Sequence, residues 1–147
     1  MSLLTPGDQQ KLRATFAEMT RPVSLLFFTQ AFDCDTCATT RQILDELPPL
    51  SDKISIEEIN LVLEREKAQQ YGVDRVPTVV LVSQDEAGVE RDSRIRFLGA
   101  PSGYEFVSLV HAVLLVGGGG SELNDASRAR VADVARPVTM QVFTTPT

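Results

Sequence analysis

The hydrophobic positions of this chain fall into short blocks whose spacing predicts helices and strands in turn. Leu12, Phe16 and Met19 recur at helical spacing, which predicts a helix from about residue 6 to residue 19. Residues 23–29 then form an almost unbroken apolar run. Such a run is typical of a strand that is buried on both faces, so we expect a central strand at this position.

The same alternation continues along most of the chain. Strands that are separated by helices usually pair in parallel, and two adjacent strands joined by a short turn form a hairpin. We therefore expect an α/β fold with a central four-stranded mixed sheet flanked by helices. The patterns predict further helices at 34–47, 63–71 and 103–116, and further strands at 53–61, 77–83 and 93–98.

A weak internal repeat extends this picture. Residues 21–29 and 136–144 are identical at five of nine positions, and each segment follows a helix-like stretch. We read the glycines at 117–120 as a flexible joint, one full unit at 1–118, and the joint, opening helix and first strand (138–144) of a second, truncated unit at 119–147. A chance match is the alternative, because Arg-Pro-Val before an apolar strand is not rare.

Composition narrows the class of protein. The 147 residues are 43% apolar and 23% charged, ordinary values for a globular domain. Acidic residues outnumber Lys and Arg by 20 to 14, so nucleic-acid binding is not expected. The longest apolar stretch is too short to cross a bilayer and the first ten residues are polar. We expect a cytoplasmic protein without a membrane partner.

The two cysteines carry the candidate chemistry. Cys34 and Cys37 form a Cys-Asp-Thr-Cys motif between a predicted strand and a predicted helix, which favours a redox pair. A structural zinc site needs four ligands, and with His111 this chain offers only three nitrogen or sulfur ligands. A chance pair on a core helix and a metal or iron–sulfur site shared by two chains are the alternatives. Our expectation is no metal and no cofactor other than a Cys34–Cys37 disulfide.

Thiol–disulfide exchange needs an attacking thiolate and a second thiol that resolves the mixed disulfide. The positive end of a helix favours negative charge, so Cys34, at the predicted helix start, is the expected nucleophile and Cys37 the resolving thiol. The carboxylate of Asp35 works in the opposite direction, because like charge raises the energy of a thiolate. We expect the pKa of Cys34 to be higher than it would be with a neutral residue at position 35.

Val76 and Pro77 are the second candidate feature. A proline at the entry of an apolar strand is commonly trans, and the residue pattern alone favours that simple reading. A cis bond in a tight bend is the alternative. The backbone of Val76 would then be free to pair with an extended substrate, as in β-augmentation.

These motifs together resemble the thioredoxin/glutaredoxin superfamily, through the Cys-Asp-Thr-Cys motif, the Gln-Tyr-Gly-Val-Asp-Arg-Val-Pro-Thr segment at 70–78 and the Phe-Leu-Gly at 97–99. Residues 99–109 more specifically resemble the tandem, glutaredoxin-like protein disulfide oxidoreductases of archaea and thermophilic bacteria. They are also similar to the N-terminal domain of the flavoprotein subunit of alkyl hydroperoxide reductase. Both families carry two fused thioredoxin-fold units. Because this first unit keeps both cysteines, the oxidoreductase family is favoured.

The resemblance implies a thioredoxin-like fold and roles for several residues. Cys34 would attack, Cys37 would resolve, and Pro77 would be cis and face them. Phe32 would supply part of the apolar platform that a tryptophan gives in thioredoxin, since this chain has no tryptophan. Gly99 would allow close backbone packing near the active loop.

One feature of thioredoxin is missing here. The apolar strand at 23–28 holds no acid, so the buried aspartate that accepts the proton of the resolving thiol in thioredoxin has no equivalent. Glu57 and Glu58 are substitute candidates.

The expected function is thiol–disulfide exchange with protein disulfides, recharged by a flavin-dependent reductase of the thioredoxin-reductase type. A peroxiredoxin is a further candidate partner. The alternative is an electron-transfer or non-catalytic docking half of a tandem protein, such as a peroxiredoxin-reductase N-terminal domain. In that case the apolar helix at 103–116 or the strand at 138–144 would form a homodimer.

Overall fold

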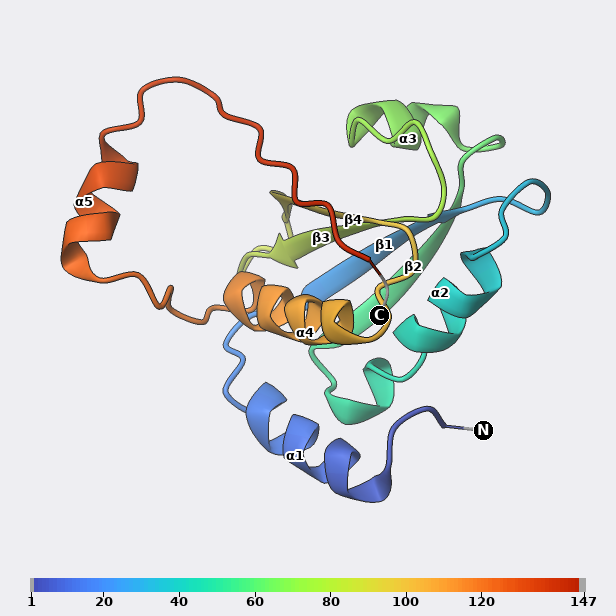
Figure 1. Cartoon of the computed structure of the whole chain (residues 1–147), viewed down its shortest axis with the longest axis horizontal. Coiled ribbons are helices and arrows are strands. Elements are labelled where there is room, and N and C mark those ends of the chain that lie inside the picture. Colours follow the sequence, from blue (N-terminus) through green and yellow to red (C-terminus); the bar gives the residue numbers. More distant parts are fainter. Residues whose placement is uncertain (1, 146–147) are drawn as a thin grey trace.

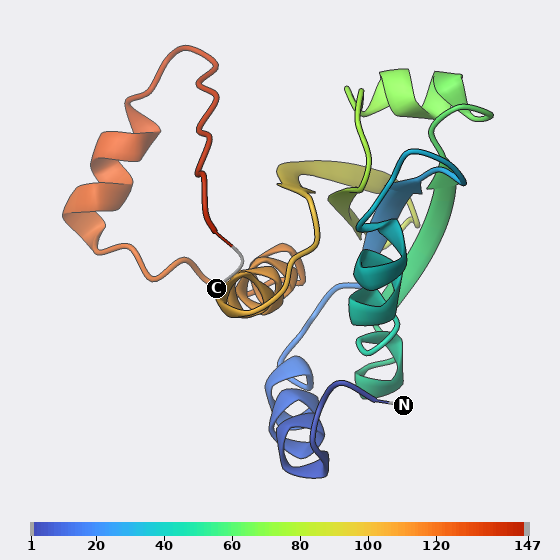
Figure 2. The same cartoon turned by 45° about the vertical axis from the view of Figure 1, so that its right-hand side comes forward.

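The computed structural model describes residues 2–145 and has a four-stranded mixed sheet with helices on both faces (Figures 1 and 2). The strand order is β2-β1-β3-β4; β1 and β2 are parallel, and the other two pairs are antiparallel. The expected α/β class and the hairpin between the last two strands are therefore confirmed. The strands are β1 (Val23–Thr29), β2 (Ile54–Asn60), β3 (Thr78–Gln84) and β4 (Glu90–Leu98).

The helices divide between the two faces of the sheet. One hydrophobic cluster joins α1, α2 and α4 to one face, and a second, smaller cluster joins the α3 region to the other. Figure 1 shows this arrangement, with α3 on the opposite side of the sheet from α4. The helices are α1 (Pro6–Phe16), α2 (Cys37–Leu44), the 3-10 turn η1 (Pro48–Leu50), α3 (Arg65–Gln70), α4 (Tyr104–Val116) and α5 (Asp125–Ala132).

Strand β1 lies at the centre of both clusters. Leu25 and Phe27 point into the cluster that contains α1, α2 and α4, whereas Leu26 and Phe28 point into the cluster beside α3. All four side chains are buried. Each such burial contributes about 1.5–3 kcal/mol, which explains why the run has no polar alternation.

Two helix boundaries differ from the sequence-based expectation. α1 is capped by the Thr5 side chain, as its sequence predicts, but it ends at Phe16 rather than near residue 19. α2 begins at Cys37 instead of Cys34, because Asp33 has a positive φ of 54° and Thr36 lies outside the helical region at φ −112° and ψ 3°. The loop must turn the chain away from β1, and this turn takes up the first residues of the expected helix.

The glycine run after α4 is tightly packed at its start and not a free joint. A Cβ atom on Gly117 would lie 2.7 Å from Met19 Cε, and one on Gly118 would lie 2.0 Å from Thr20 Oγ1. The carbonyl of Gly117 also accepts hydrogen bonds from the backbone N–H groups of Thr20 and Arg21, at 2.8 and 3.0 Å. These glycines allow a close approach between the end of α4 and the turn before β1, so the expectation of flexibility at 117–119 was wrong.

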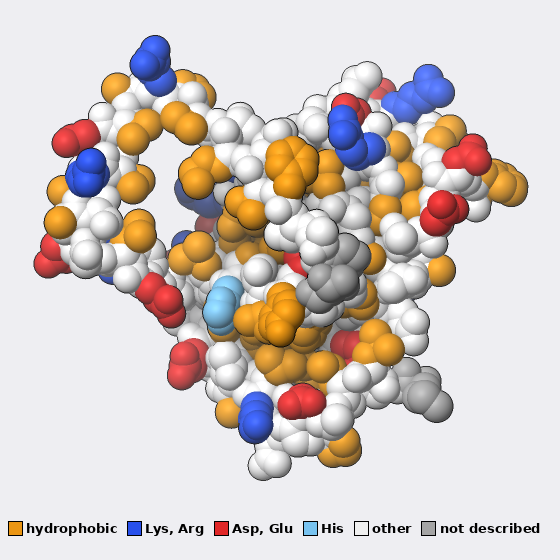
Figure 3. Space-filling model, in the orientation of Figure 1, with side chains coloured by type: hydrophobic (Ala, Val, Ile, Leu, Met, Phe, Trp, Pro, Cys, Tyr) orange, Lys and Arg blue, Asp and Glu red, His pale blue; other side chains and the backbone are white. Residues whose placement is uncertain are grey.

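The chain after the glycines forms an arm that leaves the sheet and carries α5 (Figures 1 and 3). None of residues 119–145 is buried. The helix expected here is present, but the strand expected at 138–144 is not formed. A strand needs a neighbouring strand to satisfy its backbone groups, and β1 is already paired on both sides, by β2 and β3. Within residues 2–145, no helix is both long and apolar enough to cross a bilayer.

Candidate active site

The two cysteines form a disulfide at the amino end of α2. Their Cα atoms are 5.5 Å apart. Cys37 is the first residue of the helix and is buried, whereas Cys34 lies in the preceding loop and is half-buried at the edge of the larger core cluster. The amino-terminal N–H groups of α2 lack carbonyl partners within the helix, so this end of the helix favours negative charge on a nearby sulfur.

The sheet topology brings the other predicted residues to the same end of the molecule. β1 ends at Thr29, where β3 begins with Thr78 opposite Phe28, and Thr78 also pairs with Leu98 at the end of β4. The cysteine loop after β1, the residues just before β3 and the residue after β4 therefore share one edge of the sheet. Antiparallel pairing explains this convergence of segments that are far apart in the sequence.

The Val76–Pro77 peptide bond is cis, and Pro77 is buried. Val76 is half-buried and packs against both hydrophobic clusters. Just before it, Asp74 and Arg75 form an exposed ion pair at 2.9 Å. The hydrogen bond from Arg75 lowers the pKa of the Asp74 carboxyl.

Gly99 is linked directly to this turn. Its backbone N–H donates to the carbonyl oxygen of Pro77 at 3.0 Å. Its φ is +93°, and a Cβ atom would meet nothing within 4 Å. The reason for glycine at this position is therefore the positive φ, and not the close packing that the resemblance implied.

The loop between β1 and α2 exposes its side chains around the disulfide. Phe32 is 82% exposed, so it is available as an apolar contact. Asp33 and Asp35, on either side of Cys34, are also exposed. The side chain of Gln30 fixes the loop by donating to the carbonyl oxygen of Phe32 at 2.7 Å.

A hollow of about 280 Å³ lies beside the disulfide. Both cysteines line it, but Phe32, Val76, Pro77 and Gly99 do not. The full lining is Phe27, Thr29, Gln30, Ala31, Cys34, Cys37, Ala38, Arg41 and Glu58.

Arg41 and Glu58 form an ion pair in this lining. The Arg41 guanidinium also donates to Asp45, at 2.8 and 3.0 Å. The sequence analysis did not select Arg41. Its position four residues after Cys37 was the available signal, because residues i and i+4 share one face of a helix.

The two glutamates of β2 point in different directions. Glu58, which is opposite Phe27 in the parallel pair, forms its ion pair with α2. Glu57 instead pairs with Lys67 on α3, on the other face of the sheet. Of the two candidates, only Glu58 therefore lies beside the cysteines.

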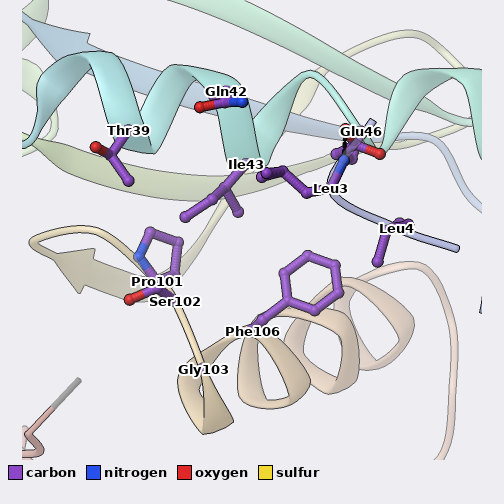
Figure 4. Close-up of a pocket in the computed structure, with 10 residues that line it drawn as sticks. All are labelled: Leu3, Leu4, Thr39, Gln42, Ile43, Glu46, Pro101, Ser102, Gly103 and Phe106. Carbon is purple, nitrogen blue, oxygen red and sulfur yellow. Dashed lines mark hydrogen bonds between the residues drawn. The ribbon is translucent and has the colours of Figure 1, made fainter. Parts of the chain in front are cut away.

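A second hollow, of about 370 Å³ and mainly apolar, lies between the N-terminal segment, α2 and the start of α4 (Figure 4). The ring of Phe106 faces Leu3, Leu4 and Ile43 across it. Neither cysteine lines this hollow, so it is separate from the disulfide.

Comparison with known proteins places this arrangement in a family, although no family model matches the chain. A probable thioredoxin from Methanothermobacter thermautotrophicus is 30% identical over 79 residues, which cover 53% of this chain and 81% of the relative. This chain belongs to the thioredoxin-like family. The alignment agrees with the mixed sheet and the Cys-x-x-Cys disulfide described above.

Longer thioredoxin-like relatives match more of the chain. The alkyl hydroperoxide reductase flavoprotein of Xanthomonas campestris (AhpF) is 35% identical over 119 residues, but the chain spans only 19% of that protein. The N-terminal domain structure of AhpF from Enterococcus faecalis aligns at TM-score 0.75 and 34% identity, covering 87% of this chain and 59% of that one. A protein disulfide oxidoreductase from Aeropyrum pernix has the same fold, at TM-score 0.72 and 24% identity, over 88% of this chain and 55% of that one.

Proposed function

We propose that this chain is a dithiol–disulfide oxidoreductase that acts on protein disulfides through Cys34 and Cys37. The observation that carries the proposal is the disulfide at the amino end of α2, with one sulfur half-buried and the other buried. In the reduced state, the more accessible Cys34 attacks the disulfide of the client protein. The buried Cys37 then attacks Cys34 and releases the client.

The client would bind along the edge of the sheet where the candidate residues converge. Val76 precedes the first paired residue of β3, so its backbone groups are placed to pair with an extended client segment. The exposed ring of Phe32 offers an apolar contact on the other side of the cysteines. Asp35 would keep the pKa of Cys34 from falling as far as the helix end alone would take it.

The partners follow from the same chemistry. A dithiol that reduces clients must itself be reduced, and the proposed reductant is a flavin-dependent enzyme of the thioredoxin-reductase type. The similarity to AhpF supports a peroxiredoxin as a further partner. A reducing compartment is needed, so the cytoplasm remains the expected location.

Reduction of insulin by dithiothreitol, followed as turbidity, tests the proposal. The wild type should accelerate the reaction, and Cys34→Ser should lower the rate to that without protein. Cys37→Ser is the matched control, because it keeps the attacking thiol. Mass spectrometry should show a trapped mixed disulfide with the client in Cys37→Ser and none in Cys34→Ser. Equal turbidity rates for the wild type and Cys34→Ser would disprove the proposal.

A docking or dimerisation half of a tandem protein is the second candidate. It is favoured by the exposed apolar side chains of the arm, among them Val138, Met140, Val142 and Phe143, which are 69–90% exposed. The repeat between 21–29 and 136–144 supports assigning the arm to a second thioredoxin-like unit. If the wild type fails to accelerate insulin reduction, this second candidate becomes the better one.

A further inference from the structure

The hollow beside the disulfide joins the buried sulfur to a single acid. Of the nine residues that line it, Glu58 is the only carboxylate and Arg41 is the only cation. The buried Cys37 lines the same space. A hollow of about 280 Å³ has room for several water molecules, so a carboxylate and a thiol that both line it can exchange a proton through water.

The position of Glu58 is fixed by its ion pair. Arg41 lies on α2, four residues after Cys37, and it binds Asp45 as well as Glu58. The guanidinium therefore joins the cysteine helix to β2 and holds the Glu58 carboxylate at the hollow. The Glu58 side chain is 50% exposed, so it can also pass a proton on to solvent.

The other charged groups near the cysteines are less well placed. Asp33 and Asp35 lie in the exposed loop and do not line the hollow. Strand β1 contributes only uncharged residues to both faces. The remaining charges around the site are Asp45 on α2, Glu57 paired with Lys67 on the opposite face of the sheet, and Asp74 paired with Arg75 before β3.

We propose that Glu58 accepts the proton of the Cys37 thiol during resolution of the mixed disulfide, and that Arg41 positions it. This inference rests on the proposed function. It assigns the proton-accepting role to the strand beside β1, because β1 itself has no acid.

The step balances as follows. The Cys34 thiolate attacks the client disulfide, forms a mixed disulfide and releases one client sulfur as a thiolate, which takes up a proton from solvent. The Cys37 thiol then gives its proton to Glu58 through water, and its sulfur attacks Cys34. The Cys34–Cys37 bond forms, the second client sulfur leaves as a thiolate and is protonated, and two electrons have passed from the dithiol to the client.

A two-phase experiment separates the two sulfurs. The reduced protein is mixed with a small aromatic disulfide whose free thiolate absorbs visible light. The first equivalent of thiolate reports attack by Cys34, and the second reports resolution by Cys37. Because the aromatic thiolate is a good leaving group, the second phase is sensitive to the loss of the proton from Cys37.

We expect Glu58→Gln to slow the second phase about tenfold at pH 7 and to leave the first phase unchanged. General bases commonly contribute more than this, but solvent can partly replace a half-exposed carboxylate. The deficit should shrink as the pH rises, because hydroxide then removes the proton instead. Arg41→Gln should give a smaller loss, and Glu58→Asp should restore part of the rate.

Glu57→Gln is the matched control, since it removes the neighbouring glutamate of the same strand and also breaks an ion pair. It should leave both phases at the wild-type rates. An unchanged second phase in Glu58→Gln, or an equal loss in Glu57→Gln, would overturn the inference. If Glu58→Gln does not fold, Glu58→Asp and Arg41→Gln decide by the same two criteria. A wild type that lacks the first phase would contradict the proposed function itself.

Discussion

Residues 21–29 and 136–144 are alike in sequence and opposite in structure. They share Arg-Pro-Val, a phenylalanine and a final threonine at corresponding positions. In the first segment, residues 23–29 form the central strand β1, and Phe28 is completely buried. In the second, residues 138–144 form no strand, and the corresponding Phe143 is 90% exposed.

The difference shows that an apolar, strand-forming sequence is not sufficient to make a strand. β1 is bonded to β2 on one side and to β3 on the other, and helices cover both of its faces. The later segment has no strand beside it. Local preference was therefore similar in the two segments, and the partners decided the outcome.

Phe28→Ala should give the largest effect among the changes that probe this comparison. We expect a loss of about 3–5 kcal/mol in the free energy of unfolding, because the substitution leaves a cavity in a packed interior. The midpoint of urea unfolding measures it. A loss below about 1 kcal/mol, the usual size for a point substitution, would show that the strand is not the packed centre described here.

Tyr71, whose ring centroid lies 6.4 Å from that of Phe28, should show an effect of intermediate size on alkaline stability. Burial, and then the hydrogen bond of its hydroxyl to Glu90 at 3.0 Å, raises the pKa of Tyr71 to about 12. The folded state thus favours the neutral phenol. The stabilisation is fully present below about pH 10, the usual tyrosine pKa, and is lost as the pH rises towards 12.

Absorbance titration of the phenolate measures this shift. Tyr104, which is 82% exposed, is the second of the two tyrosines. Tyr104→Phe therefore leaves Tyr71 as the only tyrosine, and the midpoint should lie well above the usual value. A midpoint near 10 would show that Tyr71 is not buried beside Phe28 in solution.

Phe143→Ala should have the smallest effect, within about 0.5 kcal/mol, because an exposed side chain loses no packing. It is the control for Phe28→Ala, with the same change at the corresponding position of the repeat. Urea unfolding of both variants under the same conditions gives the comparison directly. A loss that matched the one in Phe28→Ala would mean that the arm packs against something in solution.

Much of the site was accessible from the sequence because its parts are local. The Cys-x-x-Cys spacing, the apolar strand before it and the proline before a β-branched strand each lie within a few residues. The start of α2 was not accessible, since the positive φ of Asp33 depends on how the loop leaves the sheet. Gly99 was selected for the wrong reason, because its hydrogen bond to Pro77 joins two segments that meet only in the folded sheet.

By itself, the sequence determined the order of helices and strands, the buried character of β1 and the pairing of the two cysteines, since periodicity and short-range spacing encode these features. Only the tertiary structure decided which glutamate of β2 faces the cysteine helix, whether the glycines after α4 pack tightly, and which copy of the repeated segment becomes a strand. Each of these depends on contacts between residues far apart in the chain. The preferences of single residues do not record such contacts.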